Sequence, residues 1–140
     1  MTRQGGKPVG CQNSLMLTFD RKWLFLGAVL GGLSVAFGAF GVHGLRGLVT
    51  ADLLANFETA ARYQMYHALA LVAVAFVASN ARSIRTATIA GWLFVIGVVI
   101  FCGSLYAMTF TGWRWLGAIT PIGGVAMIGG WASLAVAALK

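Results

Sequence analysis

The chain has 140 residues, of which 59% are hydrophobic and only 9% are charged. Soluble domains usually carry about a quarter charged residues, so this composition excludes an ordinary water-soluble domain and indicates a membrane protein. The formal net charge is +7, but the lysine and arginine residues are spread along the ends of apolar runs, which excludes a nucleic-acid-binding module as the expected class.

The first predicted helix follows a polar N-terminal segment that shows no signal-peptide pattern. We expect a flexible basic tail over residues 1–22 and a single four-helix membrane domain over residues 23–140. The run 23–42 contains 20 residues and no charge. At about 1.5 Å of rise per residue, a helix of this length crosses the roughly 30 Å hydrocarbon layer of a bilayer.

A second helix is predicted over residues 51–79. Its uncharged part, 65–79, is too short to cross a membrane alone, but the helical pattern continues backwards. Thr50 is the expected N-cap and Asp52 lies in the first turn. We therefore expect one long helix whose first half is amphipathic and interfacial and whose second half crosses the membrane.

The third and fourth helices are predicted over residues 84–109 and 115–139. A turn at 80–83 precedes the third helix, with Ser83 as its cap. Thr120 and Pro121 fit an N-cap followed by proline at the first helical position, so we expect residues 112–119 to be partly loop. The four runs together predict an all-α fold, a bundle of four transmembrane helices.

The distribution of lysine and arginine near the helix ends predicts the orientation in the membrane. Seven would lie on one side: Arg3, Lys7, Arg21, Lys22, Arg82, Arg85 and Lys140. Three would lie on the other: Arg46, Arg62 and Arg114. This excess predicts a multi-pass protein of the cytoplasmic (inner) membrane with both termini in the cytoplasm. Trp23, Trp113 and Trp115 are expected to be interface anchors.

Small residues recur at spacings of four and three along the first helix and form one stripe on its surface. In lipid, such a stripe lets helix backbones approach closely. Glycine within a helix otherwise costs about 1 kcal/mol relative to alanine, so the stripe indicates a tight interface. The fourth helix carries Gly123 and Gly124 and is the expected neighbour. The stripe consists of Gly27, Gly31, Ser34, Gly38 and Gly41, and leucine at Gly31 or Gly38 is expected to disrupt the bundle.

Polar residues gather at the end of the first helix and in the second. Glu58 and Arg62 are four residues apart, so they share a helix face and can pair. In an antiparallel hairpin, His43 and His67 would lie near the same face of the membrane. The candidate polar cluster consists of His43, Glu58, Arg62, Tyr63, Gln64 and His67.

Four interpretations of this cluster are open. The two histidines could be axial ligands of a haem, or could bind a divalent metal with Glu58 as a third ligand. The cluster could also be a proton or ion relay. The interpretation we favour is a hydrogen-bonded clamp between the first loop and the second helix, with no metal or cofactor.

Four stretches of the sequence together resemble the small membrane proteins of domain-of-unknown-function family 423, the YgdD/YwdK-like group related to the transmembrane-256-type proteins. They are "GAFGVHGL" (38–45), "FETAARYQMYHALAL" (57–71), "GSLY" (103–106) and "LGAITPIGGVAMIGGW" (116–131). The resemblance covers the chain from residue 23 onward. It implies a compact four-helix membrane protein and no particular activity.

The function expected from these features is that of a small structural or accessory membrane component packing through glycine-rich helix faces. Its expected partners are membrane lipid and either a larger membrane complex or further copies of the chain. The alternative is a small transporter or proton relay that uses His43, Glu58, Arg62 and His67. Phosphate-binding loops, metalloprotease helices and serine-nucleophile elbows are missing from the sequence, so we do not expect an enzyme.

Overall fold

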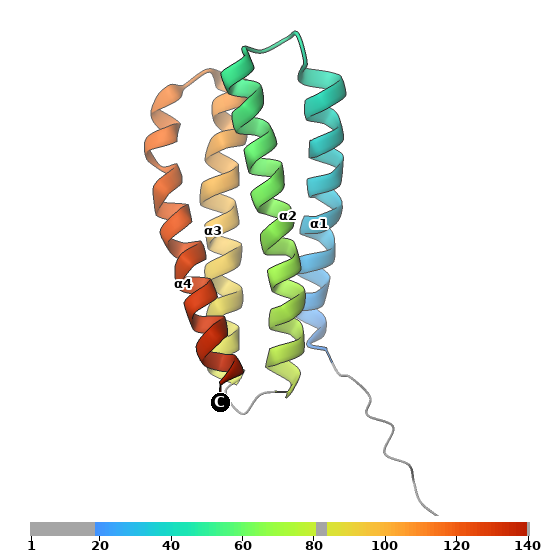
Figure 1. Cartoon of the computed structure of the whole chain (residues 1–140), viewed down its shortest axis with the longest axis vertical. Coiled ribbons are helices and arrows are strands. Elements are labelled where there is room, and N and C mark those ends of the chain that lie inside the picture. The colour runs from blue at the N-terminus through green and yellow to red at the C-terminus, as the bar shows by residue number, and fades with distance from the viewer. Residues whose placement is uncertain (1–18, 81–83, 140) are drawn as a thin grey trace, which may run out of the picture.

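The computed structural model describes residues 19–80 and 84–139, in which four long α-helices run up and down in sequence order (Figure 1). Helix α1 spans Arg21–Phe40, α2 Ala51–Asn80, α3 Ile84–Thr111 and α4 Thr120–Ala138. A π-helical turn, Gly41–Leu45, extends α1, and a 3-10 helix, Arg114–Ala118, precedes α4. All four helices are long and apolar enough to cross a membrane, which confirms the predicted all-α fold.

Each helix packs mainly against its neighbour in the sequence. Helix α1 packs on α2, α2 on α3 and α3 on α4, while α2 and α4 touch only locally. Helices α1 and α4 lie on opposite sides of the central α2–α3 pair (Figure 1). The prediction that the first and fourth helices are neighbours was therefore wrong. The short connections place each helix against the next one in the sequence, so the small residues of α1 pack on α2 and those of α4 pack on α3.

Helix α1 begins earlier than the uncharged run, because Asp20 caps it. The Asp20 carboxylate accepts hydrogen bonds from the backbone N–H groups of Lys22 at 3.0 Å and Trp23 at 3.2 Å. The Asp20 backbone N–H also donates to the carbonyl of Ala75 on α2 at 3.0 Å. The first helix thus includes Arg21 and Lys22, which the sequence places in the predicted tail. Residues 1–18 lie outside the described residues.

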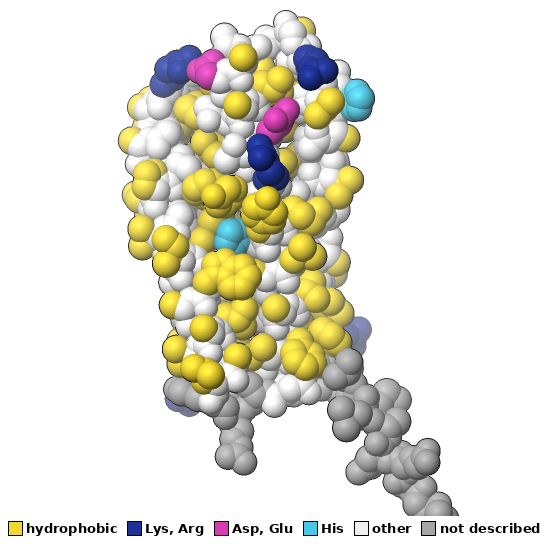
Figure 2. Space-filling model, viewed as in Figure 1, with side chains coloured by type: hydrophobic (Ala, Val, Ile, Leu, Met, Phe, Trp, Pro, Cys, Tyr) yellow, Lys and Arg dark blue, Asp and Glu magenta, His cyan; other side chains and the backbone are white. Residues whose placement is uncertain are grey.

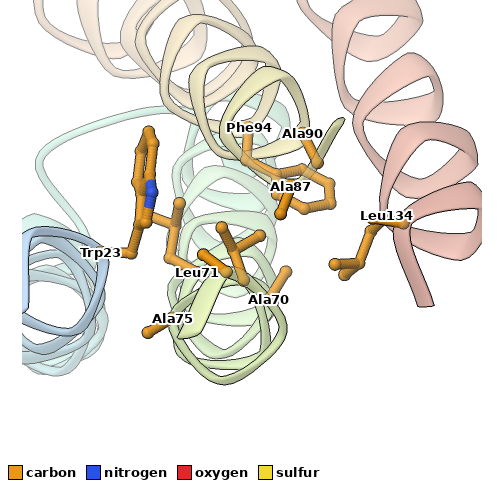
Figure 3. Packing of buried hydrophobic residues seen from close by; sticks show 11 residues of the cluster. Trp23, Ala70, Leu71, Ala75, Ala87, Ala90, Phe94 and Leu134 are labelled. Atoms are coloured by element: carbon orange, nitrogen blue, oxygen red, sulfur yellow. The ribbon is translucent and has the colours of Figure 1, made fainter. Parts of the chain in front are cut away.

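Trp23 is part of the core and not an interface anchor, which corrects the prediction. Its side chain is only 2% exposed and packs between the helices, toward Leu71 and the alanines of α2 and α3 (Figure 3). Gly91 of α3 makes room for it, since a Cβ there would lie 2.6 Å from the indole ring. Trp113 and Trp115 are exposed and stack on each other at the opposite end, as interface residues do.

Helix α2 is continuous over 30 residues, or about 45 Å, which exceeds the roughly 30 Å hydrocarbon layer by about ten residues. Its first half is part of the bundle, where Phe57 is fully buried. The hydroxyl of Thr50, the residue before the helix, donates to the carboxylate of Asp52 in its first turn. Asp52 in turn forms an ion pair with Arg114 at 2.7 Å, which joins the start of α2 to the segment before α4.

The α3–α4 connection matches the predicted partial loop closely. Helix α4 starts at Thr120, five residues after the predicted bound at 115, and Pro121 lies in its first turn. The prediction of Thr120 as the N-cap was wrong, because Thr120 is the first helical residue and Ile119 precedes it as the cap. Gly47 and Gly112 take left-handed backbone conformations, with φ of 85° and 71°, where the chain turns between helices. The predicted cap Ser83 lies outside the described residues.

Candidate functional site

Gln64 joins three helices at the centre of the bundle. Its side chain is buried on α2, and its amide nitrogen donates to the backbone carbonyl of Leu30 on α1 at 2.9 Å. Its amide oxygen accepts from the hydroxyl of Tyr106 on α3 at 3.0 Å. Gln64 therefore satisfies its polar groups on two neighbouring helices, which is a structural role in an apolar surrounding.

Hydroxyl groups form further bonds between neighbouring helices. Ser34 donates to the carbonyl of Ala61 at 2.6 Å, across the α1–α2 interface. Thr109 of α3 donates to the carbonyl of Leu53 of α2 at 3.2 Å and to its own helix. The hydroxyls of Ser104 and Thr120 lie 2.8 Å apart across the α3–α4 interface. Each interface between successive helices thus contains a side-chain hydrogen bond. The sequence predicted Ser34 only as a small residue of the packing stripe and did not predict its hydrogen bond.

The side chain of His67 is buried among aromatic rings, with 4% of the residue's surface exposed. Its Nδ1 lies 2.8 Å from the backbone carbonyl of Tyr63. A carbonyl oxygen only accepts, so Nδ1 donates and Nε2 is left as the acceptor of a neutral ring. Within the described part of the chain, the buried Nε2 has no hydrogen-bond partner. The rings of Tyr63, Phe94 and Trp131 lie around the imidazole.

The structure does not bring His43 and His67 together. His43 is exposed in the π-helical turn, two residues after Gly41, which packs on the ring of Phe57. His67 follows Phe57 by ten residues, or about 15 Å along α2. The haem-ligand and metal interpretations required the two imidazoles to be close, so they lose their geometric basis. The clamp interpretation has the histidines bonding to backbone groups between the first loop and α2, and the bond that His67 makes is to Tyr63 of its own helix. Across residues 19–80 and 84–139, no three His, Cys, Asp or Glu side chains are grouped to hold a metal ion.

Glu58 and Arg62 line a groove between α1 and α2. Figure 2 shows acidic and basic side chains close to each other on the upper part of this face, above a wide hydrophobic band. Among the described residues, however, the ion pair is Arg114–Asp52, and the predicted Glu58–Arg62 pair is not formed. The groove has a volume of about 500 Å³. Its lining consists of Ser34, Val35, Gly38, Val42, Glu58, Ala61, Arg62 and Met65.

Most of the predicted small-residue stripe faces α2. A Cβ at Gly27 would lie 2.8 Å from the backbone oxygen of Ala68, and one at Gly41 would lie 3.0 Å from the Phe57 ring. Gly31 also packs near Ala68, at an ordinary contact distance. Gly38 differs, because no neighbouring atom of the described part of the chain lies within 4 Å of its Cβ position. The expectation that leucine at Gly38 disrupts the bundle is therefore not supported by the packing.

The glycines of α4 pack on α3. Gly123 lies against the backbone of Phe101, and Gly124 makes an ordinary contact with the Phe101 ring. Tyr63, which is partly exposed, stacks on the ring of Phe101 with the two ring centroids 4.9 Å apart. Sequence reasoning also missed Tyr106, whose hydroxyl bonds to Gln64; no spacing rule relates two positions 42 residues apart.

Comparison with known proteins identifies relatives over most of the chain. Residues 37–124 match the family model described as "Protein of unknown function (DUF423)". The chain is 48% identical to the UPF0382 membrane protein YwdK of Bacillus subtilis over 118 residues, which cover 84% of this chain and 96% of that protein. It is 40% identical to a UPF0382 membrane protein of Haemophilus influenzae, with 85% and 94% of the two chains covered. No solved structure matches the chain.

Proposed function

The chain belongs to the DUF423 family of membrane proteins, and we propose that it is a non-enzymatic accessory protein that associates with other membrane proteins or with further copies of itself. The observation that carries this proposal is the use of the polar side chains within the spans. Gln64, Ser34 and the Ser104–Thr120 pair hold helices together across all three interfaces. Such bonds favour a rigid scaffold over a path for a substrate.

Glycines that remain open on the surface supply candidate contacts for a partner. Among residues 19–80 and 84–139, no neighbouring atom lies within 4 Å of a Cβ position at Gly32 on α1 or at Gly103 on α3. A foreign transmembrane helix could approach the backbone closely at either position. The glycine faces proposed for association are therefore these open positions, since Gly27, Gly41 and Gly123 are already in contact within the chain.

Leucine at Gly32 or at Gly103 is expected to leave the fold intact and to remove a bound partner or second copy. The added Cβ meets no atom of the described residues within 4 Å, and the rest of the leucine side chain would occupy the space of an approaching helix. Purification in mild detergent followed by native mass spectrometry would measure the assembly. A wild-type protein that is always recovered as a lone monomer would contradict the proposal.

We also propose the cytoplasmic membrane as its location, with both termini in the cytoplasm. Arg21, Lys22 and Arg85 lie at the ends of helices on one side, and Arg46 and Arg114 lie at the other. With Arg3, Lys7, Arg82 and Lys140 counted from the sequence, the first side carries the excess that marks a cytoplasmic face. Labelling of an Arg46→Cys variant exclusively from the cytoplasmic side would contradict this orientation.

A proton relay is the second candidate, and the observation that favours it is that the Nε2 of His67 has no hydrogen-bond partner among the described residues. A buried acceptor without a partner is costly and marks a group that could take up a proton. If His67 conducts, a His67→Ala variant in proteoliposomes is expected to slow the decay of a pH gradient. Equal decay rates for wild type and variant would eliminate the relay, and a Cys102→Ala variant provides a control at another buried position.

A further inference from the structure

The groove between α1 and α2 places one acidic and one basic side chain side by side without pairing them. Glu58 and Arg62 stand one helical turn apart on α2, so their Cβ atoms are about 5–6 Å apart. Neither forms an ion pair within the described chain, although Asp52 and Arg114 do so nearby. Ser34, the other polar side chain that lines the groove, already donates its hydroxyl to Ala61. The two charges are therefore available to a ligand.

The groove places these charges just inside the upper edge of the hydrocarbon layer. The lower edge is marked by Arg21 at the start of α1, where the Asp20 backbone N–H donates to the carbonyl of Ala75 on α2. About 20 residues, or 30 Å, above this level lie Phe40 on α1 and Ala55 on α2. Glu58 and Arg62 follow Ala55 on α2, so they lie roughly 5 and 10 Å below the level where phospholipid head groups begin. A long side chain such as that of Arg62 extends toward the head groups from this depth.

We propose that this groove binds the head group of phosphatidylethanolamine from the surrounding membrane. Arg62 would donate to the phosphate, and Glu58 would accept from the primary ammonium group. Val35, Val42 and Met65 line the same groove and would contact the glycerol backbone and upper acyl chains. The zwitterion neutralises both protein charges at once, which relieves the cost of leaving two unpaired charges at the hydrocarbon edge.

The same chemistry distinguishes this lipid from other phospholipids. A phosphatidylcholine head group has a quaternary ammonium with no N–H donor, so Glu58 could not hydrogen-bond to it. A phosphatidylglycerol head group has no cation, so Glu58 would remain unpaired beside a further negative charge. The arrangement therefore predicts preference for a primary ammonium, and not a general attraction of a basic protein to anionic lipid.

Native mass spectrometry of the purified full chain in mixed micelles would test the proposal. The micelles would contain phosphatidylethanolamine, phosphatidylcholine and phosphatidylglycerol in equal amounts with matched acyl chains. The wild type is expected to retain phosphatidylethanolamine about tenfold more than phosphatidylcholine, the effect of roughly one charge-assisted hydrogen bond. Glu58→Gln is expected to abolish this preference. Arg62→Gln is expected to reduce retention of all three lipids about tenfold.

Arg46→Gln is the matched control, because Arg46 is exposed at the same end of the bundle but outside the groove. This variant is expected to retain lipid as the wild type does, and circular dichroism would verify that all three variants are folded. Preferential retention of phosphatidylglycerol, or an unchanged preference in Glu58→Gln, would overturn the proposal. The measurement uses the chain alone, so its result is independent of whether an accessory partner exists.

Discussion

Replacing Gly123 with leucine is expected to cause the largest loss of stability of any substitution considered for this chain. The backbone nitrogen of Phe101 lies 2.5 Å from the position of a Cβ at Gly123, and the carbonyl oxygen of Gly97 lies 2.9 Å from it. Gly97 is confined in return, since its own Cβ would lie 3.0 Å from the Gly123 oxygen. The obstacles are backbone atoms, which cannot rotate away, so α3 and α4 would have to separate.

Overpacking in a core typically costs about 1–3 kcal/mol, and a clash with backbone is expected to reach or exceed the upper end of this range. The free energy of unfolding, measured by titration with SDS from mild detergent, would test it. Gly38→Leu is the matched control, because a Cβ at Gly38 meets no atom of the described residues within 4 Å. Equal stabilities for the two variants would show that the Gly97–Gly123 contact is not maintained in the membrane domain.

The glycine pattern shows what helical spacing can and cannot predict. A spacing of four and three residues correctly indicated that Gly27, Gly31 and Gly41 share the face that packs on another helix. It could not identify the neighbour, because a small residue has no side chain that distinguishes one partner from another. It also could not show that α1 leaves the surface of α2 at Gly38, where a groove opens.

The position of the second helix explains why the candidate site was predicted less well than the fold. Apolarity alone indicated a span beginning near residue 65, which placed His67 beside the membrane surface and level with His43. In the structure, residues 51–80 form one helix within the bundle, so His67 lies near its middle, about 24 Å from its start. Hydrogen bonds between distant residues, such as Gln64 to Tyr106, depend on helix rotation and register that hydropathy does not contain.

Substitution of Gln64 by leucine is expected to destabilise the bundle by about 1–3 kcal/mol. Leucine has a similar volume but removes the bonds to the Leu30 carbonyl and the Tyr106 hydroxyl. Interhelical hydrogen bonds in membranes contribute about 0.6 kcal/mol on average and up to about 1.7 kcal/mol each. Loss of both bonds, with the half-buried Tyr106 hydroxyl left without its acceptor, gives the expected range.

A double-mutant cycle separates this hydrogen bond from the general effect of changing a buried side chain. Tyr106→Phe removes the hydroxyl and keeps the ring, which packs on Phe37 and Phe57. If the bond forms in the membrane domain, Tyr106→Phe is expected to cost less in the Gln64→Leu background than in the wild type, by about 0.6–1.7 kcal/mol. Strict additivity of the two free-energy changes would mean that Gln64 stabilises the bundle through α1 alone. In that case α2 would be joined to α3 by the Thr109 hydroxyl and by apolar packing, and Tyr106 would act only through its ring.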